Sequence, residues 1–392
     1  PHLRGKPVGV APVMTESTCC IAASYEAKAY GIKTGTRISE ARALCPNIQI
    51  VAAQPAKYVQ LHNKLKAAVE SCIHVEKVLS IDEMWCWLPY NLREHATVEK
   101  IARNIKQAIH EQVSPWIKGS IGIAPNKWLA KMASKMRKPN GLLIIQQQDL
   151  PEILYDLDLR DMHGVGRSME LRLHAQGIHD ARALCHATRE KLHRAWNGVE
   201  GDRLWLQLRG KEIPELETTR RSISHGHVLP PEKRFPNNTL PVLHKLTQKA
   251  AQRLRSHGML TQSYQLSLKY VRGGRWHGEV PLPATDDSLL LARVASHLWK
   301  QRPHHKEHLL KVSMVLSRLT HADNYTPSLF DEDETQFGKT DQNIKSLNAS
   351  MDQLVQKFGR QSIYLGGAHG AIEAAPMRIA FNHVPDLEIE KD

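Results

Sequence analysis

Two stretches in the first third of the chain carry apolar residues at every third or fourth position, the spacing of one helical face. They cover 57–73 and 97–113, and the residues on the two faces are Tyr58, Leu61, Leu65, Val69 and Cys72, then Val98, Ile101, Ile105, Ile109 and Val113. Between them, "VEKVLSIDEMWCWLPY" (75–90) predicts two strands joined by a tight connection that carries Ser80, Asp82 and Glu83. Carboxylates are seldom buried unless they are paired or bind a metal. An acid pair inside what we expect to be core is therefore the first candidate site.

The rest of the chain also mixes strand and helix patterns. A Val-rich strand is predicted at 5–13, and a helical segment interrupted by glycines at 19–46. The polar, proline-containing stretch 214–234 is interpreted as a linker. The other predicted elements are a strand at 119–125, a helix at 126–141, a helical region at 150–215, helices at 240–258 and 287–301, and strands at 264–271, 274–282 and 309–319. With 392 residues, the chain is long enough for two to four domains.

The charge of the chain suggests a partner. Lys and Arg outnumber Asp and Glu by 53 to 40, so the formal net charge is +13. This surplus favours a polyanion, nucleic acid first, and the alternative is a protein that is merely basic. The six cysteines form no C-x-x-C pair, which argues against a zinc ribbon or disulfide scaffold and for a reducing compartment. No apolar run is long enough to span a membrane, and we expect no signal peptide.

A basic segment lies after the acid pair. Residues 118–141 carry six cations and no acid, and Lys127, Lys131, Lys135 and Lys138 recur every three or four residues. Such a helix face suits a triphosphate or a nucleic-acid backbone; the alternative is a solvated basic helix. Paired carboxylates can hold the two divalent metals of nucleotidyl transfer, and the alternative for Asp82 and Glu83 is an exposed hairpin turn.

A third candidate is the Gly-Val-Gly turn of "DMHGVGRSMELRLHAQGI" (161–178). A turn of this kind at the start of a helix presents backbone N–H groups to a phosphate. The alternative is an ordinary turn between helices.

Four segments, taken together, resemble a family. "AASYEAKAYGIKTGTRISEARALCP", "SIDE", "GIAPNKWLAKMASKMRKPNG" and "MHGVGRSMELRLHAQGI" occur in the order and at the spacing of the Y-family (UmuC/DinB/ImpB-type) lesion-bypass DNA polymerases. The resemblance covers residues 1 to about 320 and implies an α+β, right-hand polymerase. The domains it implies are palm (1–10 and 56–148, first strand missing), fingers (11–55), helix-hairpin-helix thumb (149–215), linker (216–223), little finger (224–322), and an acidic linker with a C-terminal tail (323–392).

The resemblance also implies roles for single residues. Asp82 and Glu83 correspond to two of three metal-binding palm carboxylates, and Tyr25 to the fingers tyrosine beside the incoming triphosphate. Lys28 stands where the family usually has arginine, so it keeps the charge but not the bidentate fork. Lys131 corresponds to the palm lysine that contacts the triphosphate. The residues implied in DNA binding are Gly164, Val165, Gly166, Arg220, Arg221, Lys269, Arg272 and Arg275.

The function implied by the resemblance is error-prone, translesion, DNA-directed DNA synthesis in an SOS-type damage response. The resemblance also implies two Mg²⁺ ions as cofactors. The partners it implies are primer–template DNA and deoxynucleoside triphosphates. A bacterial, cytoplasmic and nucleoid-associated protein is expected. "TPSLF" (326–330) ends like a sliding-clamp peptide, although it lacks the usual leading glutamine.

One family feature is absent from this sequence. The third metal-binding carboxylate and the aromatic residue that rejects ribonucleotides are expected before Pro1. We therefore expect either an N-terminally truncated copy of an active polymerase or an inactive, polymerase-like accessory protein that binds damaged DNA. A DNA-binding module built on the helix-hairpin-helix is a further alternative. The intact "SIDE" and Lys131 favour the truncated polymerase.

Overall fold

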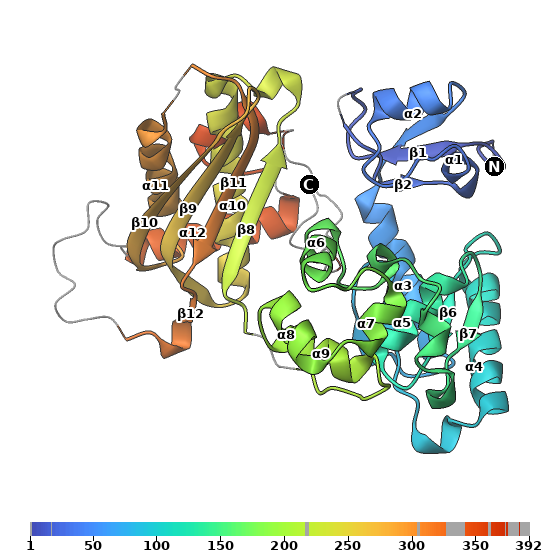
Figure 1. The fold of residues 1–392 in the computed structure, drawn as a ribbon. Helices are drawn as coiled ribbons and strands as arrows, with labels where there is room; N and C mark the ends of the chain where they lie inside the picture. The colour runs from blue at the N-terminus through green and yellow to red at the C-terminus, as the bar shows by residue number, and fades with distance from the viewer. Residues whose placement is uncertain are drawn as a thin grey trace. The chain divides into compact units, whose positions relative to one another are not determined.

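The computed structural model describes residues 2–16, 18–215, 219–303, 306–326, 342–359, 362–372, 374 and 384 (Figure 1). The chain divides into two compact units. One is residues 58–217, and the other combines residues 1–57 with most of the residues after 217. No helix in the described stretches has both the length and the apolar character needed to cross a membrane. All six cysteines carry free thiols.

The N-terminal residues form a small sheet with the strand order β2-β1-β3. Its elements are β1 (Val8–Ala11), β2 (Ala22–Ala23), α1 (Tyr25–Lys28), α2 (Ile38–Leu44) and β3 (Gln49–Ala52). β1 pairs in parallel with β3, and the buried side chains of Ile32, Ile38 and Ile48 form the local core. The predicted strand at 5–13 is confirmed at its centre.

The helical prediction for 19–46 is only partly right. This segment holds two short helices and strand β2, and the chain turns between the helices at Gly31 and Gly35, whose φ angles are 82° and 94°. Those angles suit glycine and end a helix. Strand β3 was not predicted, because its pairing with β1 joins segments about 40 residues apart that no local pattern connects.

The first half of the unit 58–217 is built from helices and two pairs of very short strands. Its elements are α3 (Pro55–Glu70), β4 (Lys77–Val78), β5 (Met84–Trp85), α4 (His95–Ala108), a π-helical turn (Ile109–Val113), β6 (Ile121–Ile123), α5 (Lys127–Met136) and β7 (Leu142–Ile144). β4 and β5 are antiparallel, whereas β6 and β7 are parallel. The two predicted amphipathic helices are confirmed as α3 and α4.

The second half of this unit is helical, as predicted for 150–215. Its helices are α6 (Arg167–Ala175), α7 (Ala181–His186), α8 (Arg189–Trp196) and α9 (Val199–Gln207). Leu154, Leu173, Leu184 and Leu192 have no exposed surface in the core of this region. Burial of each leucine contributes about 2 kcal/mol to folding. One face of α5 belongs to the same core, so this helix joins the two halves of the unit.

The largest sheet lies in the other unit and has the strand order β10-β9-β11-β8. Its strands are β8 (Ser222–Val228), β9 (Met259–Tyr270), β10 (Arg275–Thr285) and β11 (Leu309–Ser317), with a short β12 (Thr320–His321) paired to β9. Two helices, α10 (Pro236–Ser256) and α11 (Ser288–Gln301), share one buried core with the sheet. Because both helices pack on one face, the opposite face carries the polar side chains of the alternating strands.

The interpretation of 214–234 as linker is wrong for β8, which also begins inside the predicted linker 216–223. The inward-facing positions of β8 are Ile223, His225 and His227, and His227 is 4% exposed. Two of these three residues are histidines, so the alternation looks polar in the sequence. Pairing with β11, more than 80 residues later, decides the strand.

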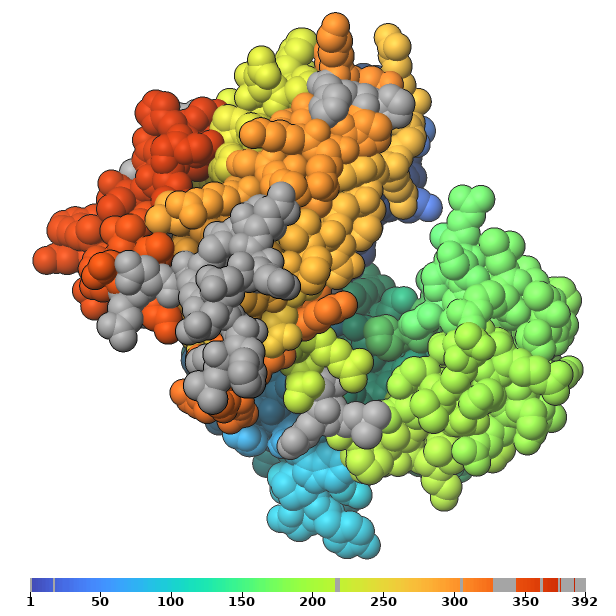
Figure 2. All heavy atoms as spheres, turned by 90° about the vertical axis from the view of Figure 1, so that its left-hand side faces the viewer, coloured from blue at the N-terminus to red at the C-terminus, as the bar shows by residue number. Residues whose placement is uncertain are grey.

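The C-terminal tail folds against this sheet-and-helix body. α12 (Gln342–Phe358) and a 3₁₀ helix (Gly366–Ala371) lie beside α10, and Figure 2 shows the red atoms of this segment against yellow and orange atoms of the body. Asp352 accepts two hydrogen bonds from the guanidinium of Arg255, at 2.6 and 2.9 Å. Met351 and Val355 are buried at the contact, so the segment is a packed part of the fold.

Candidate active site

The connection between β4 and β5 is a tight turn of residues 79–83, which we call the acid turn. The backbone N–H groups of Leu79 and Ser80 both donate to the carbonyl oxygen of Glu83, at 2.9 and 3.1 Å. Ser80 is 7% exposed, and its hydroxyl donates to Oδ1 of Asp82 at 2.7 Å. A buried hydroxyl therefore orients the Asp82 carboxylate from inside the turn.

The expectation that the acid pair lies in the core is wrong. Asp82 is exposed, and the side chain of Glu83 is 43% exposed. β4 and β5 have two residues each, and Met84 and Trp85 are only half-buried. The apolar flanks therefore support the turn without enclosing it, and the two acids avoid the cost of desolvation.

Lys131 lies at the acid turn. Its Nζ donates to Oε2 of Glu83 at 2.7 Å, and the lysine side chain is 27% exposed. This contact brings together two of the residues that the family resemblance singled out, from segments 48 positions apart. A partly exposed ion pair of this kind contributes about 0–1 kcal/mol, so Lys131 can exchange Glu83 for another anion at little cost.

The basic face of α5 is confirmed for three lysines of the predicted four. Lys127, Lys131 and Lys135 recur at four-residue intervals, but α5 ends at Met136, so Lys138 lies beyond the helix. Lys127 pairs with Glu215, and Lys135 donates to the carbonyl of Asp161 at 2.7 Å. Partial burial, and then the charges of Lys77 and Arg203, lower the pKa of Lys127.

Gly122 on β6 decides how closely α5 approaches the strand. A Cβ atom at this position would lie 2.0 Å from the carbonyl oxygen of Ala130 and 2.4 Å from the backbone nitrogen of Ser134. Any larger residue would push the helix that carries Lys131 away from β6. Sequence reasoning missed this role, because "GSIGIAP" indicates only a strand.

Tyr25 and Lys28 belong to the other unit, on α1. The hydroxyl of Ser24 caps this helix by accepting from the backbone N–H of Ala27 at 3.2 Å. Tyr25 is 52% exposed, and Nζ of Lys28 lies 4.4 Å from the centroid of its ring. The two side chains thus form one exposed aromatic and cationic surface.

The predicted Gly-Val-Gly turn lies at the start of α6, in residues 162–166, which we call the glycine turn. Gly164 has φ of 91°, a conformation that favours glycine. The side chain of Val165 is 5% exposed and packs in the helical core, so it anchors the turn. A Cβ atom at Gly164 or Gly166 would meet nothing within 4 Å, so both backbones are open to a ligand. The first N–H groups of a helix lack partners within that helix and attract anions.

Lys269 and Arg275 lie directly opposite each other on β9 and β10, on the sheet face away from the helices. Lys311 on β11 is the next partner of Lys269, and it extends the pair to a row of three cations. Sequence reasoning missed Lys311, although its alternation with buried Val312 and Met314 placed it on the outer face. Arg272 is exposed and lies in the turn between β9 and β10, between the two strands predicted at 264–271 and 274–282.

Arg220 and Arg221 precede β8 and are exposed. Loss of hydration around the guanidinium, and then the charge of Arg253, lower the pKa of Arg220. Arg220 therefore lies close to a cation of α10.

Comparisons with known proteins fit this arrangement. Residues 1–135 match the impB/mucB/samB family, 147–178 the IMS family HHH motif, and 220–329 the impB/mucB/samB family C-terminal domain. The chain is 32% identical over 372 residues to DNA polymerase IV of Moorella thermoacetica, covering 93% of this chain and 90% of the relative. The chain belongs to the Y-family of translesion DNA polymerases.

Further similarities agree with this family. DNA polymerase IV of Staphylococcus haemolyticus is 32% identical over 256 residues, which cover 65% of this chain and 71% of the relative. A solved Y-family DNA polymerase chimera of Dbh and Dpo4 has the same fold, with a TM-score of 0.66 at 22% identity over 81% of this chain and 93% of the chimera. The expectation of an α+β polymerase fold is confirmed.

Y-family polymerases use divalent metal ions, and the acid turn fits part of such a site. Asp82 and Glu83 offer hard oxygen donors at one turn, and Mg²⁺ is commonly held by one or two carboxylates together with substrate phosphates. Across the described residues, no group of three or more His, Cys, Asp or Glu side chains is close enough to hold a metal.

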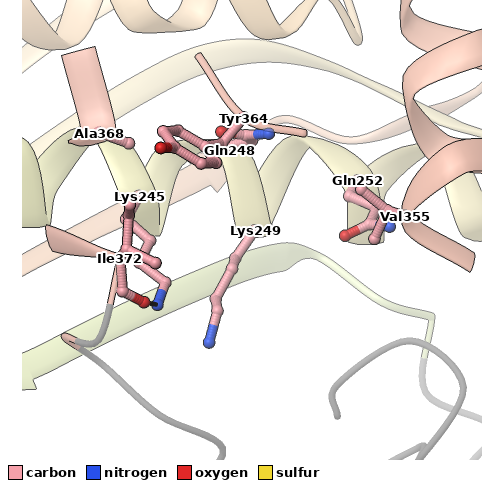
Figure 3. Close-up of a pocket in the computed structure, with 8 residues that line it drawn as sticks. All are labelled: Lys245, Gln248, Lys249, Gln252, Val355, Tyr364, Ala368 and Ile372. Carbon is pink, nitrogen blue, oxygen red and sulfur yellow. Dashed lines mark hydrogen bonds between the residues drawn. The ribbon is translucent and has the colours of Figure 1, made fainter. Parts of the chain in front are cut away.

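A small cavity lies away from these residues, between α10 and the C-terminal segment. Figure 3 shows Lys245 and Lys249 on its α10 side, and Lys245 hydrogen-bonds to the carbonyl of Ile372. Its volume is about 40 Å³, which suffices for a water or two but not for a nucleotide. It is therefore no candidate for the substrate site.

Proposed function

We propose that this polymerase extends primers past damaged template bases with the acid turn as its catalytic centre. The observation that carries the proposal is the contact between Lys131 and Glu83. It joins the candidate triphosphate ligand to a candidate metal ligand within 2.7 Å. An accessory DNA-binding protein would need the glycine turn and the basic strands, but not this pairing.

Each group at the acid turn then has a defined task. Asp82 and Glu83 would hold divalent Mg²⁺, two ions in this proposal, and the bound metal would supply positive charge for the reacting phosphate oxygens of nucleotidyl transfer. Ser80 keeps the Asp82 carboxylate oriented for that purpose. Lys131 leaves Glu83 and binds the triphosphate of the incoming deoxynucleotide. Because its ion pair with Glu83 contributes little free energy, breaking that pair costs little.

The exposed surface of Tyr25 and Lys28 binds the same triphosphate and the nascent base pair. A related solved structure is an insertion ternary complex of Dbh DNA polymerase, which supports a substrate pair of DNA and incoming nucleotide. Lys28 supplies one point charge in place of an arginine fork, so it binds phosphate with less geometric specificity.

Duplex DNA is held by backbone and by basic side chains. The N–H groups of Gly164 and Gly166, with the first N–H groups of α6, bind a DNA phosphate, as helix N-termini do. Lys269, Arg275 and Lys311 contact the sugar–phosphate backbone from the open face of the sheet, with Arg272, Arg220 and Arg221 adding charge. Such contacts carry no sequence information, which suits an enzyme that copies any template. Binding of a sliding clamp through 326–330 stays a prediction, because 327–330 lie outside the described residues.

The test is Mg²⁺-dependent primer extension past a template lesion by the full natural protein. Asp82→Asn keeps the shape of the side chain and removes its charge, so extension should fall about 100-fold or more. Asp156→Asn is the matched control, because Asp156 is also exposed but lies in another segment. If the unmodified protein binds primer–template and extends nothing, or if Asp82→Asn extends normally, the acid turn is not the catalytic centre.

A further inference from the structure

Helix α5 carries Lys131 on one face and packs its opposite face into the core of α6–α9. Trp128 and Met132, one turn apart, are 6% and 1% exposed. Leu129 and Ala133 beside them have no exposed surface. Lys131 comes from the same turn of helix, but its Nζ reaches the acid turn.

Trp128 and Met132 together hold the backbone of His163. Nε1 of the Trp128 indole donates to the carbonyl oxygen of His163 at 3.1 Å, and the N–H of His163 donates to Sδ of Met132 at 3.3 Å. His163 directly precedes Gly164 in the glycine turn. Helix α5, which carries Lys131, therefore hydrogen-bonds to both the carbonyl and the N–H of His163. His163 is the residue directly before Gly164, where we expect a DNA phosphate to bind.

Both ends of α5 are attached to the same helical region. Asn126 caps the helix by accepting from the N–H of Leu129, and its amide donates to the carbonyls of Gln207 and Lys211 at 2.9 and 3.1 Å. At the other end, Lys135 donates to the carbonyl of Asp161. Asn126 is 6% exposed, so its bonds are shielded from water. Hydrogen bonds therefore attach α5 to this helical region at both ends, in addition to the contacts of Trp128 and Met132 with His163.

We propose that Trp128 is a positioning residue that couples the two phosphate sites. Duplex DNA on the glycine turn fixes the backbone of His163, the indole holds α5 to that backbone, and Lys131 is thereby held where the incoming triphosphate binds. The inference rests on the proposed function, because it takes Lys131 as a triphosphate ligand and the glycine turn as a DNA contact. Since coupling is reciprocal, a bound triphosphate also tightens DNA binding.

Trp128→Phe tests this step, because phenylalanine still fills the core but lacks the indole N–H. We expect KM for the deoxynucleotide to rise about three- to ten-fold, the effect of one buried hydrogen bond, with kcat per active site within about two-fold. Met132→Leu removes only the sulfur acceptor and should act in the same direction with a smaller effect. Trp196→Phe is the control, because Trp196 packs against the same core from α8 and should leave KM unchanged.

A double variant separates positioning from a general loss of structure. If Trp128 acts through Lys131, adding Trp128→Phe to Lys131→Ala leaves KM where Lys131→Ala alone puts it. Two results overturn the inference: Trp128→Phe lowers kcat or the active fraction without raising KM, or the two substitutions raise KM independently and multiply. If Lys131→Ala alone leaves KM unchanged, the proposed role of Lys131 fails first, and the coupling fails with it.

Discussion

The acid turn and the glycine turn are each held in place by one side chain, but they present different groups to a ligand. Each is fixed by one nearly buried side chain, Ser80 in the first and Val165 in the second. The acid turn then presents carboxylates, whereas the glycine turn presents backbone N–H groups. A turn that acts through side chains is altered by changing charge, and one that acts through backbone is altered by changing conformation or access.

The largest effect is expected from removing the charge of Glu83 in the acid turn. Glu83→Gln keeps the size of the side chain and removes the charge, so catalytic efficiency should fall about 100-fold or more, with the affinity for primer–template unchanged. Single-turnover extension and a DNA-binding titration measure the two quantities. Glu212→Gln, at another exposed glutamate of the same unit, is the control. Equal losses of DNA affinity and rate would mean that the acid turn also contributes to holding DNA.

The opposite pattern is expected at Gly164. Alanine at φ of 91° costs about 1 kcal/mol or more of strain and distorts the turn, so Kd for duplex DNA should rise about ten-fold, with kcat at saturating DNA nearly unchanged. A DNA-binding titration and steady-state extension measure the two quantities.

Gly166→Ala sharpens this prediction. Gly166 has an ordinary φ of −93° and open space around it, so alanine should leave the melting temperature unchanged and weaken DNA binding only by blocking close approach. Unchanged DNA affinity in both variants would exclude the glycine turn from the DNA contact.

The smallest expected effect lies between the two turns, at His163. Loss of hydration around the imidazole, and then the ammonium of Lys131, lower the pKa of His163; Glu83 opposes this shift, while Lys135 and Lys127 add to it. The unfolded chain therefore takes up the histidine proton at a higher pH than the folded chain. Stability should fall as pH drops below about 6.5, the ordinary value, and level off below the folded-state pKa. Urea midpoints at about pH 7.5 and 5.5 measure it: His163→Gln should lose less stability than the unmodified protein over this interval.

The sequence predicted those parts of the site that depend on local pattern. Helical spacing placed Lys127, Lys131 and Lys135 on one face, and the turn at Ser80–Glu83 was expected from its two flanking strands. The contact of Lys131 with Glu83 is contained in neither pattern, because it is made by tertiary packing. The roles of Trp128 and Gly122 were also hidden, since an apolar helix position and a strand glycine have many ordinary explanations.

Errors in the predicted fold came from pairing between distant segments. β3 and β8 each pair with a strand far away in the sequence. Two of the three inward-facing residues of β8 are histidines, so its buried face does not show as an apolar pattern. The expected core setting of Asp82 failed for a related reason. An apolar run shows that a segment has a buried side, but not how many layers cover it.

The C-terminal segment limits where this protein can be shortened. The matches to family domains end at residue 329, yet Ala371 is 1% exposed inside the same core as the large sheet, and Asp352 holds Arg255. A chain shortened at the end of the recognisable region would keep every matched domain and expose the side of α10 that the 3₁₀ helix Gly366–Ala371 now covers. We expect such a truncated protein to aggregate when it is expressed. Its lack of activity would then result from the missing C-terminal segment and would not show that the full chain is inactive.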